Sequence, residues 1–364
     1  MREKSICFFN GNKPWGGGEK WNHEYAKLLR DHGYRVYAVC NVPSQLGDRL
    51  EQEHDVEVMR IRLGNLSFLN PIIRKKLKSF FKKSRIDTVV TALPSDLKTG
   101  GIAAKKAGVR EVVFRRGIAL PTRDTALNRY LFRNVITKLI CNSEETRRQV
   151  LSANPALLPH ERTHILYNGF DVAAFDNLPD TPLVERMGDE IVIGNAARLT
   201  AQKGQDLLIE AAAILRERGR NIRVLIAGTG ELEEELKAKA IEAGVADVVE
   251  FLGFTDDIKG FNRSLDIFAL PSLWEGFGYA MVEAMTARLP VVAFDANSMP
   301  EVVANGKTGL LAAPGDATSL ADKLDILITN ATLRQELGEA GRQRVIEKFE
   351  LHRTFAQFER ILDA

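Results

Sequence analysis

The chain has 364 residues, of which 45% are hydrophobic and 27% charged, a composition typical of a soluble protein with two domains. No window approaches the roughly 20 apolar residues of a membrane span, and no apolar signal-peptide region follows the N-terminus, so we expect a cytoplasmic protein. Three cysteines without Cys-x-x-Cys spacing argue against a disulfide framework and a thiolate metal site. Cys7, Cys40 and Cys141 are predicted to be buried thiols.

Charge is distributed unevenly along the sequence. Residues 1–166 hold 30 Lys and Arg against 16 Asp and Glu, whereas residues 167–364 hold 20 against 32. A basic first half predicts an anionic partner, such as a membrane surface or an acidic substrate.

Short apolar runs alternate with helical patterns in the first half of the chain. Strands separated by helices form right-handed βαβ units, so we expect a parallel sheet. The predicted strands are Ser5–Phe9, Arg35–Cys40, Val56–Ile61, Asp87–Thr91, Glu111–Phe114 and Val135–Cys141.

The same alternation restarts after Asn168-Gly169, with helices predicted at Gln205–Arg218 and Leu232–Ala243. The sequence therefore predicts an α/β protein with two Rossmann-like parallel-sheet domains, residues 1–167 and 168–346. The pattern of residues 333–362 predicts helix throughout. The C-terminal helix, from about residue 347 to 364, is expected to pack back on the first domain. The strands predicted in the second domain are Ile191–Asn195, Arg223–Ala227, Val248–Leu252, Asp266–Leu270, Pro290–Phe294 and Gly309–Ala312.

A triple-glycine turn, residues 16–18, separates the first predicted strand from a helix that carries Glu19 and His23. Glycines let the backbone approach a ligand closely and present N–H groups to it. The turn lacks the Gly-x-Gly-x-x-Gly pattern of dinucleotide sites and the Gly-Lys-Ser/Thr of a P-loop. For His23, a place on the surface or in helix packing is the safer interpretation.

Residues 72–85 contain seven cations and no acid, and Ile73, Leu77, Phe80 and Phe81 fall on one helical face. We expect this face to pack on the core. The basic outer face suits an anionic lipid surface, or only solvent. Nucleic acid is not favoured, because no aromatic residues are interleaved on the polar side.

Arginines cluster after the fifth predicted strand, at Arg115 and Arg116, with Arg123, Arg129 and Arg133 following. Guanidinium groups at the carboxyl edge of a sheet are suited to an anionic acceptor. A basic surface loop explains the same pattern.

In the second half, Arg198 and Lys203 lie in the loop that follows the first strand, where ligands of open α/β sheets bind. Two cations there are suited to a diphosphate, which they would stabilise as a leaving group by about 2–4 kcal/mol each. Two solvated cations are the alternative. The adjacent acids Asp256 and Asp257 are better explained by helix capping than by a metal.

The most informative stretch is Glu275-Gly276-Phe277-Gly278-Tyr279, which is followed by Glu283. A buried strand ends before it and a helix is predicted from Tyr279, so the glycine turn presents free amides at a helix N-terminus. Carboxylates accept hydrogen bonds from sugar and ribose hydroxyls. In the alternative interpretation, Glu275 only stabilises the helix dipole and Glu283 is a solvated surface residue.

Together these motifs resemble the retaining glycosyltransferases of family 4, with the GT-B fold. The resemblance covers nearly the whole chain, in order and spacing: the glycine turn with Glu19, Asn168-Gly169-x-Asp171, Arg198 with Lys203, Phe251-Leu252-Gly253-Phe254, and Glu275 to Glu283. It implies two domains facing across a cleft, the first binding an acceptor and the second a nucleotide-sugar donor.

The resemblance also implies roles for single residues. Arg198 and Lys203 would bind the diphosphate, Glu283 the ribose, and Glu275 the transferred sugar. The amides of Phe277 and Gly278, beside Tyr279, would assist Glu275; Gly253 and Phe254 would border the base; and Gly17 and Gly18 would approach the donor phosphate. Glu19, His23, Arg115 and Arg116 are the expected acceptor residues. No metal or other cofactor is expected.

In one place the chain departs from the family. Many members carry a histidine after the strand that is predicted to end at Phe114, whereas this chain has Arg115-Arg116-Gly117. An arginine there suggests a charged sugar or acceptor. Basic first domains in the family often extend lipid-linked or lipopolysaccharide glycans, which suggests a peripheral position on the inner face of the cytoplasmic membrane.

Two other functions stay open on the same fold. A sugar-nucleotide epimerase would need acid and base residues that the motifs do not supply, and a non-catalytic nucleotide-sugar-binding module would keep the fold without turnover. The sequence does not identify the nucleotide, the sugar, the acceptor, the linkage or the oligomeric state.

Overall fold

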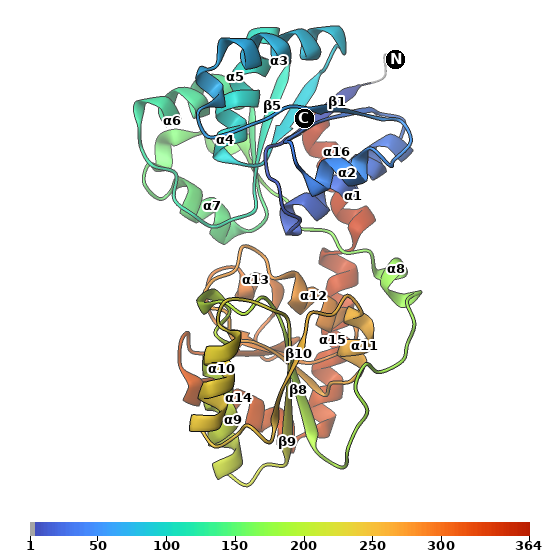
Figure 1. Cartoon of the computed structure of the whole chain (residues 1–364), viewed down its shortest axis with the longest axis vertical. Coiled ribbons are helices and arrows are strands. Elements are labelled where there is room, and N and C mark those ends of the chain that lie inside the picture. The colour runs from blue at the N-terminus through green and yellow to red at the C-terminus, as the bar shows by residue number, and fades with distance from the viewer. Residues whose placement is uncertain (1–3) are drawn as a thin grey trace. The chain divides into compact units, whose positions relative to one another are not determined.

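A computed structural model describes residues 4–364, which form two compact units (Figure 1). The first unit contains the residues up to Tyr167 together with Phe355–Ala364, and the second contains Asn168–Thr354. Each unit is built on one β-sheet whose described strands pair in parallel.

The sheet of the first unit has the strand order β3-β2-β1-β4-β5-β6-β7. Its strands are β1 (Ser5–Asn10), β2 (Arg35–Cys40), β3 (Val56–Arg60), β4 (Thr88–Thr91), β5 (Glu111–Arg116), β6 (Lys138–Cys141) and β7 (Thr163–Ile165). Its α-helices are α1 (Gly17–Asp31), α2 (Gln45–Leu50), α3 (Pro71–Lys83), α4 (Pro94–Asp96), α5 (Ile102–Ala107), α6 (Ala126–Tyr130), α7 (Glu144–Leu151) and most of α16 (Leu351–Asp363). Shorter turns are the 3₁₀ segments η1 (Ser67–Leu69), η4 (Pro155–Leu157) and η5 (His160–Arg162), and the π-helical segments η2 (Leu97–Gly101) and η3 (Leu131–Val135).

Helices cover both faces of this sheet because side chains alternate along each strand. Cys7 and Phe9 of β1 belong to a core that includes Leu77 and Phe81 of α3, while Phe8 packs on Trp21 of α1. Ile73 and Phe80 also pack against that core, as the pattern of residues 72–85 predicted.

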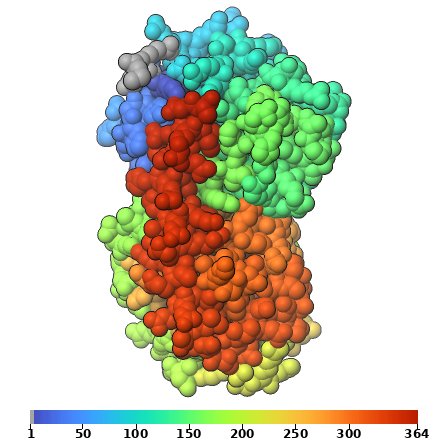
Figure 2. Space-filling model, turned by 180° about the vertical axis from the view of Figure 1, so that it is seen from behind, coloured from blue at the N-terminus to red at the C-terminus, as the bar shows by residue number. Residues whose placement is uncertain are grey.

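The C-terminal helix α16 completes the core on the α1 side. Trp21 and Tyr25 stack at a centroid distance of 4.0 Å, and Phe358 lies 5.4 Å from Trp21 and 5.3 Å from Tyr25. Phe355 packs edge-on against Tyr25. In Figure 2 the red C-terminal residues lie at the surface beside the blue N-terminal segment. The first unit therefore depends on the end of the chain for its core.

The sheet of the second unit has the order β10-β9-β8-β11-β12-β13. Its strands are β8 (Ile191–Ala196), β9 (Ile222–Ala227), β10 (Val249–Gly253), β11 (Ile267–Leu270), β12 (Val291–Phe294) and β13 (Gly309–Ala312). Its helices are α8 (Val172–Asp176), η6 (Ala201–Lys203, 3₁₀), α9 (Gln205–Glu217), α10 (Glu233–Glu242), α11 (Ile258–Arg263), α12 (Tyr279–Thr286), α13 (Met299–Val302), α14 (Ala317–Thr329) and α15 (Ala331–Lys348).

Strand order reverses between β1 and β4 in the first sheet and between β8 and β11 in the second. At such a switch point, neighbouring loops leave the sheet in opposite directions and open a crevice at the carboxyl ends of the strands. Each unit therefore has one topologically favoured place for a ligand.

The predicted strands are confirmed with small shifts at their ends, and β7 was missed. One helix prediction was wrong: residues 333–362 form two helices, because the chain is not helical at Phe349 and Glu350. There the carbonyl of Phe349 accepts a hydrogen bond from the N–H of Phe170 (2.7 Å), and the N–H of Leu351 donates to the carbonyl of Phe170 (3.0 Å).

No helix among residues 4–364 is long and apolar enough to cross a membrane. The three cysteines are free and buried, as predicted. Burial raises the pKa of the Cys40 and Cys141 thiols to about 12, so neither is a thiolate at neutral pH.

Candidate functional site

Two loops meet at the switch point of the second sheet, one after β8 and one after β11. Lys203 Nζ donates a hydrogen bond to Glu275 Oε1 at 2.5 Å. The backbone N–H of Leu273 donates to the carbonyl of Gln202 (2.8 Å), and Gln202 Nε2 donates to the carbonyl of Trp274 (2.7 Å). The structure thus brings together two residues that are far apart in the sequence.

Gly204 explains why the loops come so close. Its backbone is left-handed (φ +65°), and a Cβ placed on it would lie 2.1 Å from the carbonyl oxygen of Pro271. Any other residue would push the β8 loop off the end of β11. The neighbouring Lys203 would then move away from Glu275.

The carboxylate of Glu275 is almost completely buried, with 8% of the residue exposed. Ser272 Oγ donates to the same Oε1 that accepts from Lys203, at 2.8 Å, and Ser298 Oγ donates to the backbone carbonyl of Glu275 at 3.0 Å. A buried charge is costly unless it is paired and hydrogen-bonded. The structure meets that cost with an ammonium and a hydroxyl, which also fix the direction of the carboxylate.

Helix α12 begins at Tyr279, where the sequence predicted it, after a left-handed Gly278 (φ +84°). The ring of Phe277 is buried between Tyr279 and Phe349, with centroid distances of 5.7 and 5.4 Å, so its side chain belongs to the core. What Phe277 offers a ligand is therefore its backbone amide. Glu283 is half-buried on the same helix.

The β8 loop is held from beneath by amide side chains. Gln205 Nε2 donates to the carbonyl of Arg198 (3.1 Å) and to Asn195 Oδ1 (3.2 Å), and Asn195 Nδ2 donates to the carbonyl of Ala269 in β11 (2.8 Å). The side chain of Arg198 is exposed. A fixed backbone with an exposed guanidinium suits the capture of an anion from solvent.

Two glycines after β9, which the sequence motifs did not identify, also support this site. A Cβ on Gly228 would lie 1.9 Å from the carbonyl oxygen of Ala197, and one on Gly230 would lie 2.1 Å from that of Leu199. Both therefore support the β8 loop on either side of Arg198. A Gly-x-Gly pair directly after an apolar strand was the available signal.

Gly253 ends β10 with a left-handed backbone (φ +70°), and the ring of Phe254 is 77% exposed beside it. Asp257 caps α11, accepting from the N–H of Gly260 at 2.8 Å, as predicted. Across residues 4–364, no cluster of three His, Cys, Asp or Glu side chains is placed to hold a metal ion.

In the first unit, Gly17 and Gly18 begin α1, and Glu19 is buried. Glu19 Oε1 accepts from Asn10 Nδ2 (3.1 Å) and Asn12 Nδ2 (3.0 Å), so this carboxylate positions the loop after β1. His23 Nε2 lies 3.1 Å from Glu53 Oε1. Burial lowers the pKa of His23, although the neighbouring Glu53 opposes this shift.

Arg115 and Arg116 are not in a loop. Strand β5 extends through Arg116, two residues further than predicted, and both arginines are buried. The Arg115 guanidinium lies over the Trp21 ring at 4.1 Å, and Arg116 Nη2 donates to the carbonyl of Ile118 at 3.4 Å. The surface-loop interpretation is therefore wrong for these two residues, because aromatic packing draws them inward.

The outer face of α3 carries Lys75, Lys76, Lys78, Lys82 and Lys83, all exposed and, within residues 4–364, without an ion pair. Leu66, Leu69 and Ile72 lie just before this face and are 70%, 61% and 66% exposed. A surface with apolar side chains beside unpaired cations is typical of contact with anionic lipid.

Two family models match the chain. Residues 15–174 match "Glycosyltransferase Family 4", and residues 184–344 match "Glycosyl transferases group 1". The two matches take in most of both units, so the chain belongs to the glycosyltransferases.

Curated relatives agree with this assignment. The capsular polysaccharide biosynthesis glycosyltransferase CapM of Staphylococcus aureus is 28% identical over 58% of this chain and 58% of its own length. The GDP-mannose-dependent phosphatidylinositol monomannoside mannosyltransferase of Mycolicibacterium smegmatis is 28% identical over 89% of this chain and 88% of its own. For CapM and three other curated relatives, the match to this chain spans about half of the relative's length, 46–58%.

Among solved structures, HepE of Anabaena in complex with UDP and glucose is similar over 99% of this chain and 100% of its own, with 25% identity and a TM-score of 0.84. The predicted fold class, two Rossmann-like parallel-sheet domains of GT-B type, is confirmed.

Proposed function

We propose that the protein is a retaining, metal-independent glycosyltransferase. It transfers a sugar from a nucleoside diphosphate sugar to a hydroxyl of a glycan or lipid-linked acceptor, in the synthesis of cell-surface polysaccharide or lipopolysaccharide. The observation that carries the proposal is the contact of Lys203 with the buried Glu275, at the switch point of the second sheet.

The donor binds along the loops after β8, β10 and β11. Arg198 and Lys203 bind the diphosphate, since an exposed guanidinium and an ammonium with N–H donors to spare both suit phosphate oxygens. Glu283 accepts from the ribose hydroxyls. The exposed ring of Phe254, next to Gly253, borders the base.

The transferred sugar is held by Glu275 with the amides of Phe277 and Gly278. During transfer the bond from the anomeric carbon to the diphosphate oxygen breaks, and a bond to the acceptor oxygen forms on the same face. The acceptor proton passes to the departing phosphate oxygen. Arg198 and Lys203 stabilise the charge that develops there, by about 2–4 kcal/mol each, and no protein nucleophile is required.

The names of the relatives support the substrate class without fixing the nucleotide. HepE was solved with UDP and glucose, whereas the mycobacterial relative uses GDP-mannose. CapM and LpcC of Rhizobium leguminosarum, a lipopolysaccharide core mannosyltransferase, act in surface-glycan synthesis. Both nucleotides therefore belong in the first screen.

We also propose that the basic face of α3, with Leu66, Leu69 and Ile72, holds the protein on an anionic membrane surface. The lysines attract the lipid headgroups, and the apolar side chains enter the boundary between headgroups and acyl chains. This position suits a lipid-linked acceptor.

The experiment is a donor screen in EDTA that measures both nucleoside diphosphate release and any change in the donor sugar. Release from one donor supports the transferase, whereas an epimerised donor without release supports the epimerase. Binding without release, even with lipid-linked acceptors, points to a non-catalytic module. Inversion at the anomeric carbon of the product, or dependence on added Mg²⁺ or Mn²⁺, contradicts the mechanism.

A further inference from the structure

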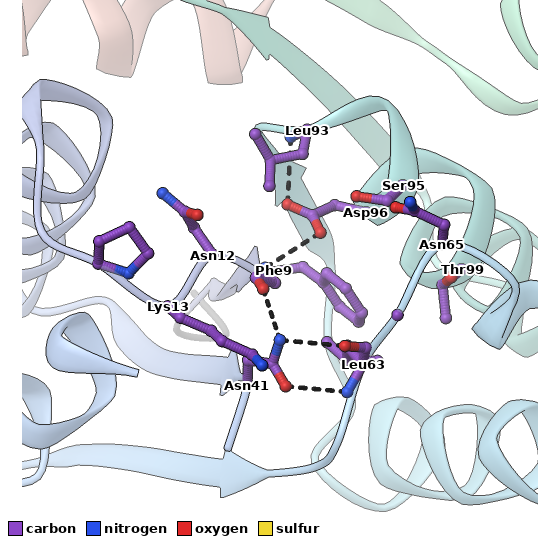
Figure 3. Close-up of a pocket in the computed structure, with 13 residues that line it drawn as sticks. Phe9, Asn12, Lys13, Asn41, Leu63, Asn65, Leu93, Ser95, Asp96 and Thr99 are labelled. Carbon is purple, nitrogen blue, oxygen red and sulfur yellow. Dashed lines mark hydrogen bonds between the residues drawn. The ribbon is translucent and has the colours of Figure 1, made fainter. Parts of the chain in front are cut away.

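A pocket of about 320 Å³, lined by polar and apolar side chains, lies at the switch point of the first sheet (Figure 3). Its walls come from the loops after β1, β2, β3 and β4, and every lining residue belongs to the first unit. In open parallel sheets this is the position at which ligands bind. The volume is in the range of small-molecule sites, which begins at roughly 300 Å³.

The pocket is built around one fixed residue, Gly11, whose N–H and carbonyl are both held by side chains. Asp96 Oδ1 accepts from the N–H of Gly11 (3.0 Å), and Asn41 Nδ2 donates to its carbonyl (2.7 Å). Asn41 also holds the β3 loop through the carbonyl and N–H of Leu63, at 3.1 and 2.9 Å. A Cβ on Gly11 would lie 2.6 Å from Asp96 Oδ1, so any larger residue would displace the Asp96 carboxylate that holds the Gly11 N–H. The walls are therefore fixed before any ligand arrives.

Other polar groups on the walls are not used by the protein. The side chains of Lys13, Asn65, Ser95 and Thr99 line the pocket and make no hydrogen bond or ion pair within residues 4–364. Figure 3 shows Asn12 and Lys13 on one side and Asn65, Ser95 and Thr99 on the other. Thr99 is buried in the π-helical segment η2, and such segments are frequent at functional sites.

These unused groups define a ligand. Two hydroxyls and an amide on one wall of the pocket, with Lys13 on the opposite wall, match the hydroxyls and an anionic group of a sugar ring. Two ionisable side chains line the pocket, those of Lys13 and Asp96. Asp96 accepts hydrogen bonds from the backbone N–H groups of Gly11 and Leu93, the second at 3.1 Å. Lys13 is therefore the charged side chain that is left for a ligand. Arg115 and Arg116, the residues predicted for an anion, are buried and do not line this pocket.

We infer that this pocket binds a sugar ring that carries a carboxylate or phosphate, with Lys13 on the anionic group and Thr99, Ser95 and Asn65 on the ring hydroxyls. The inference rests on the proposed function in one respect: the ring is taken to be part of the glycan acceptor. It reassigns recognition of an acidic acceptor from Arg115 and Arg116 to the switch point of the first sheet.

The test is ligand-observed NMR titration of the full chain with three probes. Methyl glucuronide and methyl glucoside differ only in the carboxylate, and glucose 6-phosphate supplies the phosphate. The variants are Lys13→Ala and Thr99→Val, with the exposed Lys106→Ala as control. Because the Thr99 hydroxyl has no partner in the protein, valine should fold normally.

We expect an anionic probe to bind about fivefold more tightly than methyl glucoside, and Lys13→Ala to abolish that difference. Thr99→Val should weaken all bound probes by about fivefold, while Lys106→Ala changes nothing. Preference for only one anionic probe identifies the carboxylate or the phosphate as the source.

Equal binding of charged and neutral probes, an unaltered preference in Lys13→Ala, or no binding of any probe overturns the inference. Donor turnover without acceptor, measured on the same wild-type sample, keeps the two proposals apart. If turnover occurs and the probes do not bind, only the pocket assignment fails. If the probes bind and no donor is turned over, even when lipid-linked acceptors are added, only the proposed function fails.

Discussion

Replacing Lys203 with methionine keeps most of the length of the side chain and removes its charge. Glu275 would then be buried with a single remaining partner on Oε1, the hydroxyl of Ser272. Removing one member of a buried ion pair typically costs 3–5 kcal/mol, because the other charge is left without compensation. The Lys203 side chain is 16% exposed, so some water reaches the gap and we expect about 3 kcal/mol.

The double variant Lys203→Met, Glu275→Gln separates stability from chemistry. A neutral amide retains the hydrogen bond from Ser272 and removes the uncompensated charge, so the loss of stability should shrink to about 1 kcal/mol. Donor turnover should remain lost, because the proposed contacts to the phosphate and the sugar are both gone. As control, Lys239→Met breaks the partly exposed pair with Glu210 and should cost less than about 1 kcal/mol.

Hydrogen exchange of peptides from β11 and α12, measured as a function of urea, follows the second unit separately from the first. An unchanged free energy of unfolding in Lys203→Met would refute the reasoning. So would a double variant that is no more stable than the single one.

Three further changes are predicted. Burial raises the pKa of Asp96 from 3.8 to about 7, so between these values the folded protein keeps a proton that the unfolded chain has lost. The stability of wild type relative to Asp96→Asn should fall by about 1.4 kcal/mol per pH unit between pH 5 and 7, measured by urea unfolding. Phe358→Ala, at the centre of the α16 aromatic cluster, should destabilise the first unit by about 3–5 kcal/mol, seen as faster hydrogen exchange in α1. Replacing Lys75, Lys76 and Lys82 with Glu should weaken binding to vesicles of anionic lipid, measured by sedimentation, without loss of donor turnover.

Each of these predictions has a contrary outcome. A pH-independent stability difference would show that Asp96 is not responsible for the slope. Unchanged exchange in α1 would separate α16 from the first core. The control for vesicle binding is a variant that removes the same charge from another exposed site, with Glu in place of Lys105, Lys106 and Arg110. Equal weakening in this control would show that binding depends only on the net charge of the protein. Unchanged binding in the α3 variant would contradict the membrane proposal.

The sequence pattern predicted those elements whose burial and backbone geometry depend on neighbouring residues alone. Apolar runs predicted the central strands, and the glycine turn predicted the start of α12. Strand β7 was missed because it has only three residues, and two of them, Thr163 and His164, are polar, so the strand shows no apolar run. The break at Phe349 carries no glycine or proline signal, because backbone pairing with Phe170 and packing on Phe277 produce it.

Long-range packing decided the rest of the candidate sites. The burial of Arg115 depends on Trp21, which lies far away in the sequence and makes a buried arginine tolerable. The pocket around Gly11 could not be predicted, because its walls come from four separate loops. Asn41 and Asp96 look like ordinary loop residues until the fold brings both of them to the backbone of Gly11.

The central claim is that sugar transfer occurs at Glu275, and the most direct measurement compares Glu275→Ala with Glu242→Ala, an exposed glutamate on α10. Nucleoside diphosphate release is measured in EDTA with the donor found in the screen, together with the affinity for the free nucleoside diphosphate. We expect Glu275→Ala to abolish release and largely keep the affinity, while Glu242→Ala behaves as wild type. Release that persists in Glu275→Ala would contradict it.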